Sequence, residues 1–295
     1  MKILRADHLG MCFGVRDAIA LALNESRREP VTVLGDLVHN ETVLQSLRSQ
    51  GIQFASDAAS VGTRAVMITA HGASQKAMQA VRDRGLSLTE ATCPLVHVAH
   101  RAVLQLVSAG YHPVIIGKRD HVEVRGLTGD LQAFDVVLSE ADVESLPERP
   151  RFGVAAQTTQ PIQKVRILVD LIRTRFPQSE VRFVDTVCQP TKLRQSSAVE
   201  LARRCEAVVV IGGAHSNNTH ELVRTCSQHC RRVYHVQTAT ELKPDWFEGV
   251  ETIGITAGTS TPDYVIDAVE QWLRRIEVDG NGPVPRPAHP LAQAA

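Results

Sequence analysis

The stretch Cys93–His121, CPLVHVAHRAVLQLVSAGYHPVIIGKRDH, contains the pattern that decides the fold. A cysteine begins it, apolar residues with helical spacing follow, and the apolar run PVIIG ends at Gly117. A short apolar strand after a helix is typical of α/β proteins, in which parallel strands alternate with helices. The polar side chain of His121 comes four residues after the glycine, where such sheets present their binding loops.

The same pattern occurs three times in the 295 residues, and three is therefore the number of structural repeats that we expect. The cysteines that begin the copies are Cys12, Cys93 and Cys188. The glycines that end the first strands are Gly35, Gly117 and Gly212, which follow their cysteines by 23, 24 and 24 residues. A hydrogen-bonding side chain stands four residues after each glycine: His39, His121 and Ser216.

A second apolar strand follows in each copy and again ends in small or polar residues. The expected second strands lie at 66–72, 152–159 and 252–260 and lead to His71, Thr158 and Ser260. Helical patterns are expected over residues 13–23, 74–84, 94–107, 161–176, 191–204 and 262–276. The third copy has no strand after its last helix, so the apolar N-terminal strand is expected to complete its sheet.

The sequence therefore predicts an α/β fold of three pseudo-threefold-related lobes with largely parallel sheets. The expected boundaries are 11–92 for the first lobe, 93–187 for the second, and 188–280 with the strand in 1–10 for the third. Four prolines among small and polar residues predict a flexible tail over 281–295.

Composition excludes several classes of function. Hydrophobic residues make up 43% and charged residues 22%, which is typical of a globular protein. The net charge is zero and aromatic residues are only 4%, so we expect no nucleic-acid partner. Neither a signal peptide nor a membrane span is expected, which predicts a cytoplasmic protein without a membrane role.

Three repeated cysteines point to a metal centre. One thiolate from each lobe near a common axis suits a cubane iron–sulfur cluster at the centre of the lobes, with one iron not bound by protein. Spacing alone leaves open three buried cysteines at strand ends. Cys205, Cys226 and Cys230 lie outside the repeat. A zinc site at Cys226 and Cys230 with nearby histidines is conceivable, but small residues on a buried helix face are the favoured interpretation.

The polar residues after the strands predict an anion site. His39, His71, His121, Ser216, Asn218 and Ser260 could surround a diphosphate with neutral donors. The segment Gly212–Thr219, GGAHSNNT, combines a glycine turn with a helix start, where anions bind. Glu123 lies two residues after His121, on the same side of an expected extended segment, and could deliver a proton that Thr158 holds or relays. The alternative for Glu123 is a solvated loop acid paired with Arg119 or Arg125.

Several motifs together resemble those of the 4-hydroxy-3-methylbut-2-enyl diphosphate reductase (LytB/IspH) family over residues 2–275. They are GMCFGV (10–15), VHN (38–40), AHG (70–72), ATCPLV (91–96), HVEVRG (121–126), QTT (157–159), DTVC (185–188), SNNT (216–219) and TAGTSTPD (256–263). The resemblance implies a three-lobed α/β protein with one 4Fe-4S cluster held by Cys12, Cys93 and Cys188 and a fourth iron open to the substrate.

The resemblance also implies a reaction and its residues. The family removes the hydroxyl of its substrate by two-electron reduction, which gives isopentenyl and dimethylallyl diphosphates, the last step of the non-mevalonate route to isoprenoid precursors. Its diphosphate-binding positions match His39, His71, His121, Ser216, Asn217, Asn218 and Ser260, and its proton-delivery pair matches Glu123 and Thr158. Reduced ferredoxin or flavodoxin is implied as the electron donor.

Four positions depart from the family pattern. Val122 replaces an expected proline, Asn217 a frequent serine, and Gln189–Pro190 is an unusual pair after the third cysteine. Two other classes of function remain alternatives. An iron–sulfur redox sensor or electron carrier would lack the diphosphate site, and a zinc-dependent hydrolase would contain zinc without iron.

Overall fold

A computed structural model describes residues 1–279, and for 277–279 it describes the backbone alone. The predicted tail at 281–295 lies outside these residues. The chain forms two compact units, one with residues 1–16, 38–50 and 192–279, the other with residues 17–37 and 51–191. No helix in the described part of the chain is both long and apolar enough to cross a membrane.

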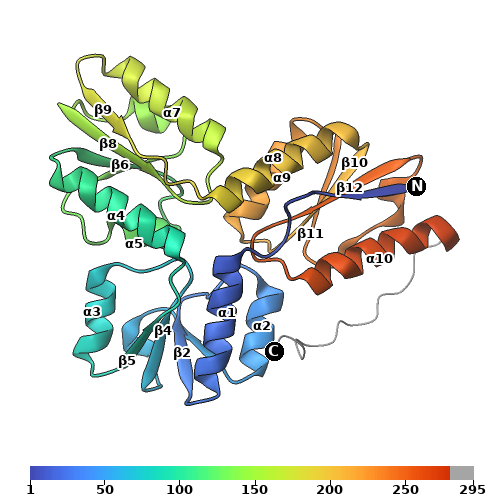
Figure 1. Ribbon diagram of the computed structural model, residues 1–295, viewed down its shortest axis with the longest axis horizontal. Helices are drawn as coiled ribbons and strands as arrows, with labels where there is room; N and C mark the ends of the chain where they lie inside the picture. The colour runs from blue at the N-terminus through green and yellow to red at the C-terminus, as the bar shows by residue number, and fades with distance from the viewer. Residues whose placement is uncertain (280–295) are drawn as a thin grey trace. The chain divides into compact units, whose positions relative to one another are not determined.

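Three four-stranded sheets form the framework, and every strand pair in them is parallel. The order β3-β2-β4-β5 joins Gln53–Ala55, Val31–Leu34, Ala65–Ile68 and Ser87–Glu90. The order β7-β6-β8-β9 joins Asp135–Val137, His112–Ile116, Arg151–Ala156 and Glu180–Phe183. The order β11-β10-β12-β1 joins Arg232–Val236, Ala207–Ile211, Thr252–Ala257 and Lys2–Arg5. Figure 1 labels most of these strands.

The third sheet is completed by the start of the chain, as the sequence predicts. In the first two sheets the fourth strand leads into a cysteine, β5 to Cys93 and β9 to Cys188. In the third sheet β1 takes this place, pairs with β12 with Lys2 opposite Thr252, and leads to Cys12. The three sheets therefore share one topology. The lobe boundaries expected above stay a prediction.

The helices connect the strands in the manner of α/β folds. The longer ones are α1 (Phe13–Ser26), α4 (Pro94–Ser108), α7 (Ile162–Arg175), α8 (Gln189–Arg204), α9 (Asn217–Ser227) and α10 (Asp263–Asp279). The shorter ones are α2 (Glu41–Ser49), α3 (Gln75–Asp83), α5 (Val122–Thr128) and α6 (Glu140–Glu144), with short 3-10 turns at 58–60, 239–241 and 244–247. All six predicted helices are present within a few residues of their expected ends.

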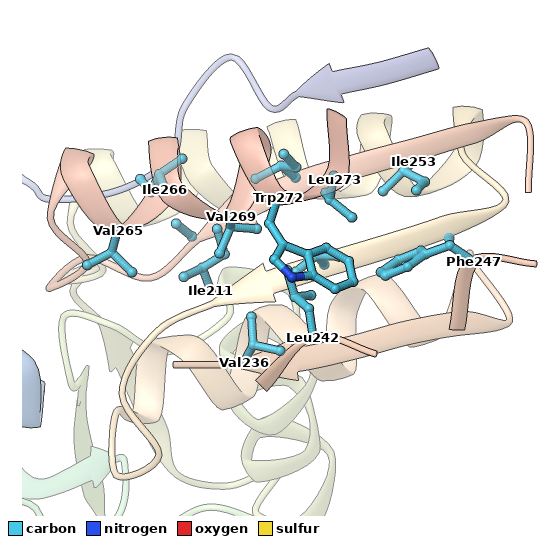
Figure 2. Close-up of a cluster of buried hydrophobic side chains, with 14 of the residues drawn as sticks. Ile211, Val236, Leu242, Phe247, Ile253, Val265, Ile266, Val269, Trp272 and Leu273 are labelled. Atoms are coloured by element: carbon cyan, nitrogen blue, oxygen red, sulfur yellow. The ribbon is translucent and has the colours of Figure 1, made fainter. Parts of the chain in front are cut away.

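Each central strand is buried on both faces. On β6, Val114 and Ile116 pack with residues of α6 and α7, whereas Ile115 packs with residues of α4 and α5. On β10, Val209 faces a core with α10, and Val208 faces one with α8 and α9. Figure 2 shows Trp272 of α10 in the first of these β10 cores. Burial on both faces explains why these strands are continuous apolar runs without alternation.

Candidate active site

The predicted site residues lie directly beyond the carboxyl ends of the strands. Those after β2, β6 and β10 are His39, His121 and Ser216; those after β4, β8 and β12 are His71, Thr158 and Ser260. The cysteines follow β1, β5 and β9. Because parallel strands end at the same edge of their sheet, the second sheet presents His121 and Thr158 together with Cys188, and the third presents Ser216 and Ser260 together with Cys12.

The three repeated cysteines share a local geometry. Each is a cysteine directly before a helix: Cys12 before α1, Cys93 before α4 and Cys188 before α8. Each backbone N–H donates to the loop after the neighbouring strand, from Cys12 to Thr259 O (3.1 Å), from Cys93 to Ala70 O (3.0 Å) and from Cys188 to Thr158 O (3.0 Å). Partial positive charge at a helix start stabilises a thiolate, so these positions suit metal-bound sulfur.

His71 and His121 lie together in the unit of residues 17–37 and 51–191. Their rings meet edge to face with centroids 5.4 Å apart. The N–H of Glu123 donates to Nδ1 of His121 at 3.1 Å, so a neutral His121 ring carries its proton on Nε2. His121 is thereby fixed as an Nε2–H donor.

Glu123 and Thr158 form a buried pair in the same unit. Thr158 donates from its backbone N to Oε1 of Glu123 (2.6 Å) and from Oγ1 to Oε2 (2.9 Å). Glu123 is only 1% exposed. Burial raises the pKa of Glu123 to about 7, although both hydrogen bonds from Thr158 favour the charged form and lower it. A carboxyl group with this pKa can hold a proton near neutral pH and release it.

Two expectations about Glu123 are wrong. Residues 122–128 form helix α5, with His121 as its N-cap, and are not extended. The β-branched Val122 and Val124 favoured a strand, but the cap and the burial of Val124 favour the helix. The carboxyl group is also no solvated loop acid, because its partner is Thr158 and Arg119 donates instead to Val136 O (3.2 Å).

His39 and Ser260 lie in the other unit, beside the loop after β10. Ser260 Oγ donates to His39 O (3.3 Å). A Cβ at Gly213 would collide with the same carbonyl oxygen, so only glycine permits this approach. Asn40, which the sequence analysis did not single out, caps α2 and donates from Nδ2 to Ser260 O (2.9 Å). Its place before a helix was the signal that could have identified it.

The start of α9 presents buried polar atoms without hydrogen-bond partners among the described residues. Ser216 is the N-cap, and its Oγ accepts from Thr219 N (3.3 Å). The buried Nδ2 atoms of Asn217 and Asn218 and the Oγ1 atom of Thr219 have no hydrogen-bond partner within residues 1–279. Buried polar atoms are nearly always paired in native proteins, so these atoms indicate a ligand or water. An anion at a helix start accounts for the two amide donors.

The remaining cysteines lie in a hydrophobic core. Cys226 is fully buried and Cys230 is 7% exposed, in one cluster with Leu222 of α9. Cys226 is on α9 as expected, but Cys230 lies beyond the end of that helix at Ser227. Burial raises the pKa of Cys205 to about 11 and that of Cys226 to about 12, so both favour the neutral thiol. The interpretation as small buried residues is supported over the zinc site.

Comparisons with known proteins show which family this chain is similar to. The model of the family described as "LytB protein" matches residues 3–274. A relative from Syntrophotalea carbinolica, named 4-hydroxy-3-methylbut-2-enyl diphosphate reductase, is 36% identical over 91% of this chain and 97% of its own. One from Aquifex aeolicus with the same name is 36% identical over 94% of this chain and 97% of its own.

Solved structures show the same likeness. One described as (E)-4-hydroxy-3-methyl-but-2-enyl diphosphate reductase, the terminal enzyme of the non-mevalonate pathway, is 35% identical, with a TM-score of 0.67 over 94% of this chain and 100% of that one. A reductase structure from Plasmodium falciparum is 23% identical, with a TM-score of 0.85 over 98% of this chain and 95% of that one, and supports the fold. From the family model and these identities, the chain belongs to the LytB family.

Proposed function

We propose that the chain reduces 4-hydroxy-3-methylbut-2-enyl diphosphate to isopentenyl and dimethylallyl diphosphates, the terminal step of the non-mevalonate route to isoprenoid precursors. Its membership of the LytB family and the names of its relatives support this reaction. The observation that carries the proposal is the buried Glu123–Thr158 pair. A proton donor with a pKa near 7 serves a reaction that expels water, whereas an electron carrier does not need one.

The proposed cofactor is one 4Fe-4S cluster with Cys12, Cys93 and Cys188 as its ligands. These residues fit the group, because each is a cysteine at a helix start, whereas burial raises the pKa of the Cys205 and Cys226 thiols. The cluster would supply electrons one at a time and an iron without a cysteine ligand that polarises the C–O bond of the substrate.

The diphosphate is proposed to bind through neutral donors. Ser216, Asn217 and Asn218 at the start of α9 provide hydroxyl and amide groups, and the amides have free N–H donors. We propose the same role for His39 and Ser260, and for His71 and His121 of the other unit. Hydrogen bonds to an ionised acceptor contribute about 1.5–3 kcal/mol each, so a few such donors hold a diphosphate without a lysine or arginine.

Glu123 is proposed to protonate the leaving hydroxyl, with Thr158 and His121 beside it. The overall step consumes two electrons and two protons, breaks a C–O bond, forms a C–H bond and releases water. Thr158 Oγ1 lies 2.9 Å from Oε2 of Glu123 and can pass a proton to or from that oxygen. His121, fixed as an Nε2–H donor, orients the substrate without taking the proton from Glu123.

The electron donor is proposed to be a reduced ferredoxin or flavodoxin. The proposed compartment is the cytoplasm, because the three ligand thiols must stay reduced to bind iron. Both assignments follow from the proposed chemistry.

Anaerobic purification with iron and sulfide assays tests the cofactor. Cys93→Ser is expected to lose iron, sulfide and the visible absorption of the cluster, because it removes a proposed ligand. Cys226→Ala is the matched control, a core thiol outside the repeat, and is expected to keep all three. Full iron content in Cys93→Ser would refute the ligand assignment. Zinc in place of iron would support the hydrolase alternative. A cluster whose absorption spectrum does not change when the diphosphate substrate is added would support the redox carrier.

A further inference from the structure

The loop between β10 and α9 is held from outside by side chains to which the proposed reaction assigns no role. His235 of β11 donates from Nε2 to Gly212 O (2.9 Å), and His220 of α9 donates from Nε2 to Ala214 O (2.6 Å). The Ala214 N–H donates to Oε1 of Gln237 (3.1 Å). Side chains therefore bind backbone groups of both Gly212 and Ala214 in this loop.

The two histidines also contact each other. Their rings meet at 67° with centroids 5.7 Å apart, so each limits the movement of the other. Gln237 is fixed in turn, because its backbone N–H donates to Oε2 of Glu241 (2.9 Å). The outer side of the loop is therefore a connected set of side chains, which we call the outer brace: His220, His235 and Gln237.

The inner side of the same loop lies close against neighbouring residues. A Cβ at Gly212 would collide with Thr219, and one at Gly213 with the carbonyl oxygen of His39. The loop ends at Ser216, whose N–H donates to Gly213 O (3.1 Å) and whose Oγ caps α9. A movement of the loop carbonyls would therefore move Ser216 and the first turn of α9, which presents Asn217 and Asn218.

We propose that His220 and His235 are positioning residues that hold the loop 212–216 so that Ser216, Asn217 and Asn218 present their donors to the diphosphate, an inference that rests on the proposed function. Neither imidazole needs to touch the substrate, because each Nε2–H is used on a loop carbonyl. A donor array fixed before binding loses less entropy when the anion arrives. His220 is exposed, so its replacement leaves the core intact.

The test uses the cluster-containing full chain and inorganic pyrophosphate as the probe. His220→Ala and His235→Ala are each expected to weaken pyrophosphate binding roughly three- to tenfold, the effect of one lost hydrogen bond. KM for the diphosphate substrate should rise by the same factor, with a smaller change in kcat. His220→Gln and His235→Gln keep an N–H at the position of Nε2 and should restore binding. The matched control is His229→Ala, an exposed histidine just beyond the same helix.

Hydrogen exchange of the amides of residues 216–220 separates this inference from the proposed function. Faster exchange in both alanine variants, with normal exchange in the glutamine variants, supports the outer brace. This result does not depend on pyrophosphate binding. If the wild-type protein binds no pyrophosphate, the proposed diphosphate site is refuted and the outer brace is not. Unchanged exchange and unchanged pyrophosphate affinity in both alanine variants would overturn the inference. Equal losses in the alanine and glutamine variants would overturn it as well, because the N–H donors would then be irrelevant.

Discussion

The loops after β6 and β10 show how one framework serves two kinds of chemistry. Both follow one of the two central strands of a four-stranded parallel sheet, and both end at a helix N-cap, His121 for α5 and Ser216 for α9. The second residue of each helix differs: it is Glu123 in α5 and Asn218 in α9, and both are buried. An acid at this position can give a proton, whereas an amide donates or accepts hydrogen bonds but has no acidic proton to give.

The environment of each side chain reinforces the difference. Both carboxylate oxygens of Glu123 accept hydrogen bonds from Thr158, and the side chain is buried. Asn218 Nδ2 has no protein partner in the described residues, so it is available to a ligand. The contrast predicts that a change at position 123 affects the chemical step and that a change at position 218 affects binding.

The largest expected effect is that of Glu123→Gln. The amide keeps the shape of the carboxyl group but has no acidic proton, so substrate should bind with near-normal affinity and react at least about 100-fold more slowly. Single turnover of chemically reduced protein is the measurement, because it removes electron delivery from the comparison. Glu123→Asp, about one methylene shorter, should fall between. Full activity of Glu123→Gln would exclude the proton-donor role.

The reciprocal change, Asn218→Asp, is expected to act on binding. A carboxylate here would face the proposed diphosphate, and like charges brought together cost several kcal/mol, so pyrophosphate affinity should fall about 100-fold. Asn218→Ala, which removes only a donor, should lose roughly tenfold. Titration calorimetry with pyrophosphate distinguishes the two, and the cluster spectrum should stay unchanged in both. Equal affinities of the aspartate and alanine variants would show that no anion binds beside this residue.

The pH dependence of the single-turnover rate is expected to show a smaller effect, which belongs to the Glu123 loop alone. Glu123 must be protonated to act, and burial sets its pKa at about 7, so the single-turnover rate should fall about tenfold for each pH unit above that value. Below about pH 6 the rate should level off. The residual rate of Glu123→Gln should lack this slope. A wild-type rate that is constant from about pH 6 to 9 would contradict the role of burial.

The sequence predicted the positions of these loops but not their supports. Apolar runs at β6 and β10 and a polar residue four positions after the glycine located His121 and Ser216 correctly. The edge strands β3, β7 and β11 were not predicted, and β3 and β7 have only three residues each. A short edge strand has too few apolar positions to show a period.

The fine structure of the site depends on tertiary contacts that leave no local pattern. The burial of Glu123 follows from the approach of Thr158, 35 residues away in the chain. The hydrogen bonds from His220 and His235 end on backbone carbonyls, which every residue possesses, so no side-chain type marks the accepting position. After β2 the N-cap of the next helix, α2, is Asn40, one residue beyond His39. The constant offset of four residues from the glycine therefore did not identify the N-cap in this loop.

The smallest expected effect is on the free energy of unfolding, and it concerns the segment that follows α5. Two residues beyond α5, Asp130 accepts from the backbone N–H groups of Gln75 (2.7 Å) and Lys76 (3.0 Å) at the start of α3. Asp130→Ala should therefore lower the free energy of unfolding by about 1 kcal/mol, the cost of a lost helix cap, while Ser74 still caps α3.

The control Asp170→Ala removes only an exposed ion pair with Arg173 and should lose about half as much or less. Denaturant unfolding measures both, and pyrophosphate affinity should change less than threefold because Asp130 supports α3 and not the loop 212–216. A stability loss no larger than that of Asp170→Ala would show that Ser74 alone holds this helix start.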